Sequence, residues 1–441
     1  LGTSDGTPYD GESAFTYVPK PKEKAEPWVH MGSVAASVSD GALISNVTNF
    51  IKIHTPDSEN YAKVCMGGLV SMGDGTAVIE NSVNRGDVVC DASLGYVTGA
   101  SNHQLGGIMC KTDGKVTISN CKNYGNISAA GAYVDNVGGI MANPNGNSTD
   151  KGDNKTYIKG CYNYGNITIT KTTSAKSPMA LGGIVGKLTG ATIEDCHNEG
   201  NISSVCDVLT GIGGVAGIHK LDFESKVTGC SNGVQNTTDK GILTFAPEAG
   251  TQQMVIGGIL GYSEDYTGKL TVQSCTNYAP ISTSYNVMRN IGGICGAIGD
   301  ITSSRDGLIS SIQALIDNCN NYGAITISGT GTFSSWQRHV GGIAGMIYGS
   351  ELGVTVSNCT NNATISTTAT GGGEHRIAGI VGHVRYGKVE ISMCTNNGEV
   401  KATESATNPR PAGIVSVAQE GTSIAISKCT NTKKITSASA V

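Results

Sequence analysis

Four tyrosines share one register of an internal repeat, each directly after a recurring asparagine. They are Tyr124, Tyr164, Tyr278 and Tyr322, and they form two pairs in consecutive units. Two outward-facing rings about 5 Å apart, the spacing of neighbouring strands, could stack on the rings of a sugar. The same rings could instead lie over a turn and shield the asparagines beside them. Both interpretations are compatible with the spacing.

A second set of residues that could bind a ligand is basic and lies in the last third of the chain. These residues precede the glycine pairs of successive late units: Arg289, Arg338, His375, Arg376 and Arg410, with Trp336 beside them. A column of positive charge along one edge could hold an anionic glycan or an acidic partner. The alternative is that these charges belong to solvated loops.

Catalytic carboxylates are a third possibility, because polysaccharide lyases and hydrolases also use β-helical folds. Such sites require acidic side chains clustered on neighbouring units, often with Arg or Ca²⁺. The 35 acidic residues are instead scattered, and no aligned set recurs. The repeats contain no Cys-x-x-Cys and no His-x-x-x-His spacing. We therefore expect no catalytic residue, no metal site and no cofactor.

The overall charge and hydropathy exclude two classes of partner. The formal charge is −5, and no basic stripe with interleaved aromatic residues suggests nucleic acid. No apolar run is long enough to cross a membrane, so we expect no transmembrane segment. The chain begins at Leu1, without Met and without a signal peptide. We expect that a leader has been removed, or that the sequence begins at a chosen boundary.

The elements that must position these residues repeat eleven times. Each unit contains an asparagine two residues after a position that is cysteine in nine units. The asparagines are Asn49, Asn84, Asn123, Asn163, Asn198, Asn232, Asn277, Asn321, Asn361, Asn396 and Asn431. The preceding positions are Val47, Ser82, Cys121, Cys161, Cys196, Cys230, Cys275, Cys319, Cys359, Cys394 and Cys429. These positions give a mean period of about 38 residues.

The pattern of each unit predicts short strands. The unit is Ile-x-x-Cys-x-Asn-x-Gly-x-Ile, preceded by Gly-Gly-Ile-x-Gly, and the last aliphatic position fails only at Asn236. Its apolar segments have period two and are bounded by Gly and Asn, and no helical face persists. We predict an all-β fold: a single parallel β-helix (β-solenoid) of about eleven coils over 29–441. Residues 1–28 are expected to form an extended segment or cap.

The interior of this solenoid should consist of stacked columns. Each Asn amide would donate to the Asn of the next coil, which satisfies a group that otherwise costs about 1–3 kcal/mol when buried. We place the Asn in a turn, because Asn tolerates left-handed backbone, and the Gly-Gly pair at a corner without room for Cβ. The Cys column is expected to hold buried free thiols. Disulfides between adjacent coils are the alternative. We expect a right-handed coil, although the residues do not fix the hand.

One segment resembles a known repeat family. Gly-Gly-Ile-Val-Gly at 182–186, followed by Ile-Glu-Asp-Cys-His-Asn-Glu-Gly-Asn-Ile at 193–202, resembles the GLUG-type repeats of bacterial, often Bacteroidetes, surface proteins. The resemblance extends over 30–435. It implies a solenoid outside the cell or on the bacterial surface, with adhesion or scaffolding as its function. It supplies no catalytic residues.

We therefore predict a non-enzymatic structural or adhesive protein that displays loops to a glycan or surface protein. The variable stretches 170–178, 237–252 and 328–337 are the expected loops, because insertions in repeat proteins usually leave one face. One alternative is a carbohydrate-active enzyme. Another is an accessory subunit of an outer-membrane assembly, with a partner docked on the last coil, after which only 436–441 follow.

Overall fold

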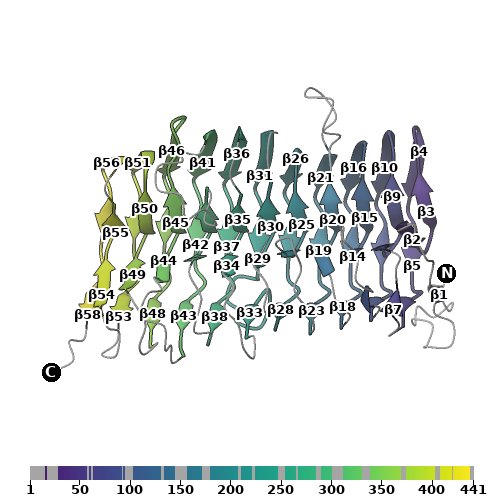
Figure 1. Ribbon diagram of the computed structural model, residues 1–441, viewed down its shortest axis with the longest axis horizontal. Helices are drawn as coiled ribbons and strands as arrows, with labels where there is room; N and C mark the ends of the chain where they lie inside the picture. The colour runs from purple at the N-terminus through teal and green to yellow at the C-terminus, as the bar shows by residue number, and fades with distance from the viewer. Residues whose placement is uncertain are drawn as a thin grey trace.

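The computed structural model describes most of the repeat region and a short segment before it. The described ranges are 15–16, 28–56, 59–60, 63–91, 93–94, 103–130, 134–144, 156–170, 179–206, 210–220, 224–246, 254–264, 267–284, 290–299, 311–329, 338–368, 374–402, 408–419 and 421–437. Within them the chain forms strands and turns and no helix. Figure 1 shows the strands of successive coils side by side along one long axis, from β4 at one end to β56 at the other.

Each coil contains five short strands, and equivalent strands of successive coils pair in parallel. The result is five sheets with one strand from each of eleven coils, numbered first to fifth in chain order. This confirms the predicted eleven-coil parallel β-helix. The fifth sheet has a twelfth strand, because β1 pairs in parallel with β6 of the first coil. Outside these sheets, β7 (Glu59–Asn60) pairs with β13 (Ser93–Leu94).

The first and second sheets flank the glycine pairs. The first sheet contains β2 (Trp28–Gly32), β8 (Lys63–Gly67), β14 (His103–Gly106), β19 (Val134–Gly138), β24 (Met179–Gly182), β29 (Thr210–Gly213), β34 (Met254–Gly257), β39 (Asn290–Gly292), β44 (Arg338–Gly341), β49 (Glu374–Ala378) and β54 (Asn408–Ala412). The second sheet contains β3 (Ala35–Val38), β9 (Val70–Gly73), β15 (Met109–Thr112), β20 (Met141–Pro144), β25 (Val185–Leu188), β30 (Ala216–His219), β35 (Leu260–Ser263), β40 (Cys295–Ile298), β45 (Ala344–Tyr348), β50 (Val381–Arg385) and β55 (Val415–Ala418).

The other three sheets complete the coil. The third contains β4 (Ala42–Ser45), β10 (Thr76–Glu80), β16 (Lys115–Ser119), β21 (Thr156–Lys159), β26 (Ala191–Glu194), β31 (Glu224–Thr228), β36 (Thr267–Gln273), β41 (Ser311–Asp317), β46 (Val354–Ser357), β51 (Gly387–Ser392) and β56 (Thr422–Ser427). The fourth contains β5 (Thr48–Asn49), β11 (Val83–Asn84), β17 (Lys122–Asn123), β22 (Tyr162–Asn163), β27 (His197–Asn198), β32 (Ser231–Asn232), β37 (Thr276–Asn277), β42 (Asn320–Asn321), β47 (Thr360–Asn361), β52 (Thr395–Asn396) and β57 (Thr430–Asn431). The fifth contains β1 (Phe15–Thr16), β6 (Ile53–Thr55), β12 (Val88–Cys90), β18 (Ile127–Ala129), β23 (Ile167–Ile169), β28 (Ile202–Ser204), β33 (Leu243–Phe245), β38 (Ile281–Thr283), β43 (Ile325–Ile327), β48 (Ile365–Thr367), β53 (Val400–Ala402) and β58 (Ile435–Ser437).

The predicted asparagine ladder runs the full length of the stack. In each of ten steps the Nδ2 of one Asn donates to the Oδ1 of the next, at 2.7–3.0 Å. The second Nδ2 proton goes to a carbonyl in the turn that follows, as from Asn198 to Gly200 O at 2.9 Å. Nine of the eleven side chains are completely buried, Asn49 is nearly so, and Asn431 at the last coil is exposed. The amide stack is thus confirmed, with both donor protons used from Asn49 to Asn396, whereas Asn431 in the last coil donates only to Lys433 O.

The expectation that the ladder Asn occupies a left-handed turn is wrong. Each Asn belongs to a two-residue strand of the fourth sheet, so its backbone is extended and its side chain points inward. The left-handed residue is the one directly before the Cys position, with φ between 47° and 65° in every coil: Asn46, Asn81, Asn120, Gly160, Asp195, Gly229, Ser274, Asn318, Asn358, Met393 and Lys428. The two-residue turn between the third and fourth strands requires this conformation even of Met393 and Lys428.

The Gly-Gly corner and the Asn ladder meet across the coil. A Cβ on Gly183 would lie 2.2 Å from the carbonyl oxygen of Gly214 and 2.3 Å from Cγ of Asn198. The predicted absence of room for Cβ at this corner is confirmed, and its cause is contact with the ladder. The Gly-Gly pair and the ladder Asn, the two recurring features of the repeat, are therefore in contact with each other in the coil.

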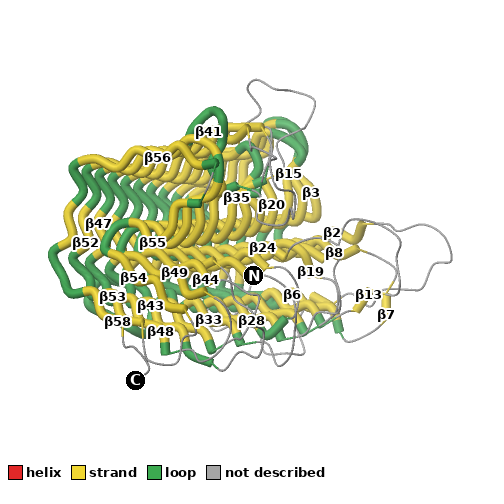
Figure 2. Tube along the Cα trace, turned by 60° about the vertical axis from the view of Figure 1, so that its left-hand side comes forward, coloured by secondary structure: helices red, strands yellow, loops and turns green. Residues whose placement is uncertain are grey.

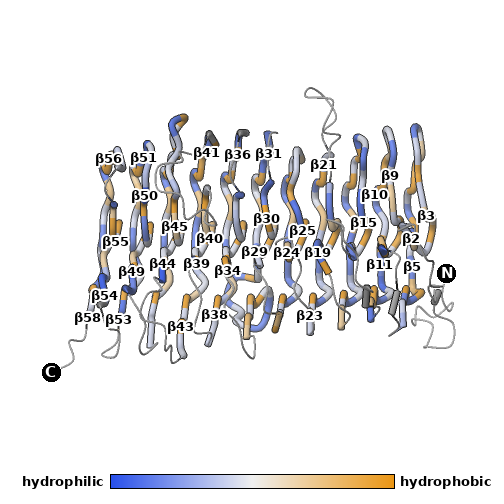
Figure 3. Tube along the Cα trace, in the orientation of Figure 1, coloured by the Kyte–Doolittle hydropathy of each residue, from blue (hydrophilic) through white to orange (hydrophobic). Residues whose placement is uncertain are grey.

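The hydrophobic interior has two parts. One cluster contains inward residues of the second and third sheets together with the Cys column. The other contains inward residues of the first and fifth sheets. Hydrophobic positions recur from coil to coil along each sheet (Figure 3). All fourteen cysteines are free thiols, and in the column each Sγ donates to backbone carbonyls, as Cys196 does to Glu194 O at 3.3 Å. The column thus behaves as packed, hydrogen-bonded thiol groups.

One coil carries an insertion that sequence reading misplaced. The aliphatic position that fails at Asn236 is filled by Leu243, which pairs with Ile202 in the fifth sheet. Asn236 itself is a left-handed turn residue. The ladder is maintained because Asn232 donates to Gly241 O, nine residues on, at 3.0 Å. The stretch 237–252 is therefore not one loop, since it contains strand β33.

Candidate functional site

The first and second strands of each coil fold back on each other at the glycine pair, so their outer faces meet. Residues seven apart in sequence contact each other across this space. In one coil Arg376 Nη1 lies 2.7 Å from Nε2 of His383, and in another Val255 packs with Tyr262. Figure 2 shows the first sheet, with β8, β24 and β49, running beside the second, with β3, β20 and β55. We call the space between these outer faces the wedge.

The residues that line the wedge are defined by strand register. From the first sheet they are His30, Cys65, Gln104, Asn136, Ala180, Gly211, Val255, Asn290, His339, Arg376 and Arg410. From the second sheet they are Ser37, Met72, Lys111, Asn143, Lys187, Ile218, Tyr262, Ala297, Met346, His383 and Val417. The chemistry of this lining changes from coil to coil. The middle coils are mainly apolar, whereas both ends carry polar and charged groups.

The basic residues predicted from sequence lie on late strands of the first sheet, but on its two different faces: Arg376 and Arg410 line the wedge, whereas Arg338 and His375 share the inner face with Val340 and Ile377. Arg338, His375 and Arg376 lie on β44 and β49 and are buried, with Arg410 on β54 beside them. The solvated-loop interpretation is therefore wrong for the three buried residues. It failed because the second sheet covers Arg376 on the outer face, and because Arg338 and His375 lie on the inner face. Arg289 lies outside the described residues, as does Trp336.

Hydrogen bonds hold these basic side chains in fixed positions. Glu374 accepts from Arg376 Nε and Nη2 at 2.8 and 2.6 Å, and from Arg410 Nη2 at 2.6 Å. Arg338 Nη1 lies 2.7 Å from Nε2 of His375. Burial lowers the pKa of both Arg338 and Arg376. The side chain of Arg410 is 46% exposed, so it is the cation that this cluster offers to solvent.

His383 is kept neutral at this end of the wedge. Burial, followed by the charges of Arg376 and Arg385, lowers its pKa to about 3. A neutral imidazole can accept a hydrogen bond, and Arg376 Nη1 is the donor next to it. The His339 ring lies against the His383 ring, with centroids 4.5 Å apart, and His339 Nδ1 lies 2.7 Å from Asn290 Oδ1. Sequence reasoning missed Glu374 and the packing of His339 on His383. The seven-residue spacing across a Gly-Gly corner could have indicated only the contact of Arg376 with His383.

The predicted tyrosine pairs are stacked rings on the outside of the fourth sheet. The Tyr124 and Tyr164 centroids are 4.6 Å apart with planes at 9°, and those of Tyr278 and Tyr322 are 5.5 Å apart at 16°. The Arg85 guanidinium lies over the Tyr124 ring at 4.6 Å. Because the paired rings cover each other's faces, they present their edges and hydroxyl groups outward. Their use in partner binding stays a prediction.

Two further rings extend the first tyrosine pair. Tyr162 stacks on Tyr164 with centroids 5.9 Å apart, and His197 lies 4.8 Å from Tyr162 in the next coil. Burial, followed by the charge of Glu199 and the neighbouring rings, raises the pKa of Tyr164. The position directly before each ladder Asn is a second outward column, so the same register analysis could have identified this extension.

Buried polar groups at the N-terminal end of the wedge were not predicted. The side-chain oxygens of Gln104, Asn136 and Asn143 are buried and have no hydrogen-bond partner among the groups that the structure describes. Burial raises the pKa of Asp135 to about 6, although the charges of Lys187 and Lys220 act in the opposite direction. These groups lie on β14, β19 and β20, next to the strands on which Trp28 and two cysteines outside the repeat column meet.

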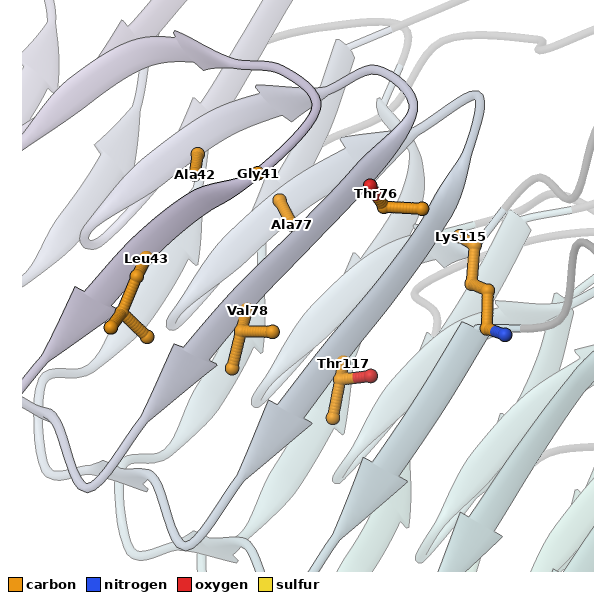
Figure 4. Close-up of a pocket in the computed structure, with 8 residues that line it drawn as sticks. All are labelled: Gly41, Ala42, Leu43, Thr76, Ala77, Val78, Lys115 and Thr117. Carbon is orange, nitrogen blue, oxygen red and sulfur yellow. The ribbon is translucent and has the colours of Figure 1, made fainter.

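A shallow hollow lies on the outer face of the third sheet, over β4, β10 and β16. It has a volume of about 400 Å³. Figure 4 shows Leu43, Val78 and Thr117 in one row across these strands, with Lys115 at the edge. The lining contains no carboxylate, His or Cys. It therefore offers an apolar surface without a general acid, base or nucleophile.

Several other features of the described residues bear on the predicted partners. No cluster of three or more His, Cys, Asp or Glu side chains in these ranges could hold a metal ion. No helix in them could cross a membrane. In the last coil the strands β54–β58 form one edge of each sheet, and Ile426 and Ile435 are 48% and 38% exposed. A partner docked on this coil stays a prediction.

The fold and its columns define this chain as a parallel β-solenoid repeat protein. Residues 177–203 match the family described as the GLUG motif. The matched segment contains Cys196 of the thiol column, together with the glycine pair at 182–183 and Asn198, which meet at the corner. This confirms the similarity to GLUG repeats. Comparison with curated proteins and with solved structures found no match.

Proposed function

We propose that this chain is a non-enzymatic structural or adhesive rod. In this proposal it is located outside the cell or on a cell surface, and it presents the open side of the wedge and the loops beside it to a glycan or protein partner. The regular interior supports a structural role, because it contains the same hydrogen-bonded column in every coil. The match to the GLUG motif is compatible with that role.

The observation that carries the proposal is the position of the variable connections. The connections from first to second strand and from third to fourth strand have two residues in every coil. Those entering the first strand vary from four residues at 130–133 to twelve at 91–102. Those leaving the second strand vary from one residue at 386 to twelve at 299–310. Both of these connections adjoin the open side of the wedge, opposite the Gly-Gly corner. The connection from fourth to fifth strand has three residues in every coil except one, where 233–242 are inserted. Most of the sequence variation is therefore on one side.

The charge at the C-terminal end of the wedge suggests the chemistry of the partner. Arg410 is half exposed and shares Glu374 with the buried Arg376. A carboxylate or sulfate group of a partner could bind the Arg410 guanidinium in place of its bond to Glu374. A guanidinium suits this role because it can bind such groups through two hydrogen bonds. An acidic glycan or an acidic protein segment is therefore the partner class that we propose.

A binding experiment with matched variants tests the proposal. The full chain would be applied to an array of neutral, carboxylated and sulfated glycans and to acidic surface proteins. Arg410→Ala removes the exposed cation of the wedge, whereas Lys401→Ala removes a similarly exposed cation, paired with Glu399, from the fifth sheet. We expect acidic ligands to bind, and Arg410→Ala alone to weaken binding at least several-fold.

Two outcomes would overturn the proposal. One is equal loss of binding in both variants, or no binding to any member of the array. The other is turnover of a polysaccharide panel that disappears when a single acidic residue is changed, which would instead support a carbohydrate-active enzyme. Release of reducing ends and change in viscosity would be measured on the same preparations.

A further inference from the structure

Two cysteines outside the repeat column meet between the first and second sheets, near the N-terminal end of the wedge. Cys65 lies on β8 of the first sheet and Cys110 on β15 of the second sheet, in the next coil. Their Sγ atoms are 2.7 Å apart, and both side chains are completely buried. A disulfide bond is about 2.05 Å long, so these sulfurs need to approach by less than about 1 Å. They come from facing strands, which directs their Cβ–Sγ vectors toward each other.

The column cysteines have a different geometry. Neighbouring column residues such as Cys161 and Cys196 occupy equivalent positions in the turns between the third and fourth strands of successive coils, whose backbones repeat at about 4.8 Å. Their side chains point in the same direction, and each sulfur donates to a carbonyl two residues earlier, at 3.4 and 3.3 Å. This spacing lies within the Cα range of disulfides, but parallel side chains do not direct the two sulfurs at each other. The pair at Cys65 and Cys110 is thus distinct within the set of fourteen thiols.

We propose that Cys65 and Cys110 are a specific site of oxidation that forms a disulfide between the second and third coils. The co-reactant is a low-molecular-weight disulfide. The Cys65 thiolate attacks one sulfur of that disulfide, which gives a mixed disulfide and releases one thiolate. Cys110 then loses its proton and attacks Sγ of Cys65, which releases the second thiolate. Two protein thiols are oxidised to one disulfide, and the small disulfide is reduced to two thiols.

The surroundings assign the order of attack. Burial raises the pKa of Cys65, but the hydrogen bond with Cys110, the hydrogen bond and charge of His30 and the charge of Lys111 together lower it to about 6. Burial and the neighbouring Cys65 raise the pKa of Cys110. Cys65 is therefore the first nucleophile, since the thiolate is the reactive form. Trp28 of the first coil packs over the pair, so opening of this end coil admits the oxidant.

A serine in the preceding coil shows which substitution of Cys110 should keep the fold. In the preceding coil Ser71 occupies the position of Cys110, and its Oγ donates to Cys65 O at 2.8 Å. Cys110 Sγ makes the equivalent hydrogen bond to Gln104 O at 3.2 Å. Cys110→Ser can therefore keep this hydrogen bond while removing the second sulfur. Cys429→Ser, in the partly exposed end of the column, is the matched control.

Thiol counting and peptide mapping after oxidation test the proposal. The full chain would be reduced, treated with oxidised glutathione, freed of reagent and titrated in denaturant. The titre of the natural chain is expected to fall from fourteen thiols by two, with one peptide linking Cys65 to Cys110. Cys429→Ser should lose the same two thiols. Cys110→Ser should instead trap one glutathione on Cys65, visible as an added mass.

Three results would overturn the proposal. The first is an unchanged titre of fourteen thiols at full exposure to oxidant. The second is a linkage between cysteines of the repeat column. The third is a Cys110→Ser chain that forms an intramolecular disulfide as readily as the natural chain. Circular dichroism of each variant confirms that it is folded before oxidation.

Discussion

The interior columns and the wedge are made from the same eleven coils, yet they differ in how they vary. The Asn ladder has the same two donor bonds in every coil, from Asn49 to Asn396. The wedge changes from a Cys and amide cluster, through an apolar middle, to a cluster of Arg and His. Both regions are largely buried, so exposure does not separate them. The difference indicates that stacking requires the same ladder residue in every coil, whereas residues that differ between coils are concentrated in the wedge.

Interruption of the ladder is expected to have the largest effect. Asn198→Leu leaves the Asn163 donor, the Asn232 acceptor and the Gly200 carbonyl without partners. Three buried groups at about 1–3 kcal/mol each predict a loss of roughly 3–9 kcal/mol in the free energy of unfolding. Asn431→Leu in the exposed last coil removes a single inter-coil bond and should cost about 1 kcal/mol. Urea unfolding compares the two, and equal losses would contradict a ladder that stabilises through burial.

The buried ion pair of the wedge is the next test. Arg376→Met leaves Glu374 partly buried with only Arg410 as its ionic partner. Breaking a buried pair typically costs about 3–5 kcal/mol, so we expect a loss near the lower limit because Arg410 remains. Arg410→Met, at a half-exposed side chain, should cost less than about 1 kcal/mol. Thermal unfolding of both variants measures the difference. A larger loss in Arg410→Met would show that the buried guanidinium is not the fixed element of this cluster.

His219 is a titratable residue in the interior, so it gives a prediction about how stability depends on pH. His219 lies at an interior position where the preceding coil has Leu188, and its Nδ1 is 2.9 Å from Ser263 Oγ. Burial lowers the pKa of His219 to about 4. As the pH falls below about 6.5 the unfolded chain gains a proton that the folded chain cannot accept, so stability is lost down to pH ~4. The loss is about 3 kcal/mol, from a shift worth 1.36 kcal/mol per pKa unit.

Replacement of this histidine isolates its contribution. His219→Leu, which copies Leu188, should abolish about 3 kcal/mol of the acid-dependent loss and leave that of the other buried histidines. Unfolding free energies at pH 7 and pH 4 in the natural chain and the variant give the comparison. An identical acid dependence in both chains would show that His219 does not titrate as a buried neutral group.

The stacked tyrosines are expected to contribute least to stability. Tyr164→Leu removes the ring contacts with Tyr124 and Tyr162 on the outside of the fourth sheet. Aromatic pairs contribute about 0.5–1.5 kcal/mol beyond area burial, so we expect a loss of about 1 kcal/mol. A loss as large as that in Asn198→Leu would mean that the rings protect the ladder, which was the alternative interpretation of their position. Urea unfolding in the same buffer distinguishes these outcomes.

The repeat alone was sufficient to predict the solenoid, its eleven coils and its amide stack. Period and residue type determine these features, because a polar group at one register of stacked strands must meet its own copy. The left-handed residue before each Cys was missed because Asn, Gly, Asp, Ser, Met and Lys all occupy it. The insertion after Asn232 was missed because the next strand, which contains Leu243, lies outside the regular spacing.

The wedge could be predicted only in part, for a geometric reason. Arg338, His375 and Arg376 were identified as a column, but the burial of Arg376 depends on the second sheet folding back over the first, whereas Arg338 and His375 are buried on the inner face of the first sheet. That fold-back is set by the Gly-Gly corner and its contact with a ladder Asn. Pairs such as Cys65 with Cys110 come from different coils and different sheets. Their proximity therefore requires the coil geometry as well as the register.

Exchange of the asparagine side-chain amides gives the most direct test of the ladder. The chain would be labelled with ¹⁵N in asparagine only, and the resonances assigned through single substitutions such as Asn198→Leu. The ladder residues from Asn49 to Asn396 donate both Nδ2 protons within the stack. Their side-chain amide protons should therefore exchange with deuterated solvent far more slowly than those of exposed asparagines such as Asn46. Exchange of the ladder amides at the rate of the exposed asparagines would contradict the continuous hydrogen-bonded column on which this description of the molecule rests.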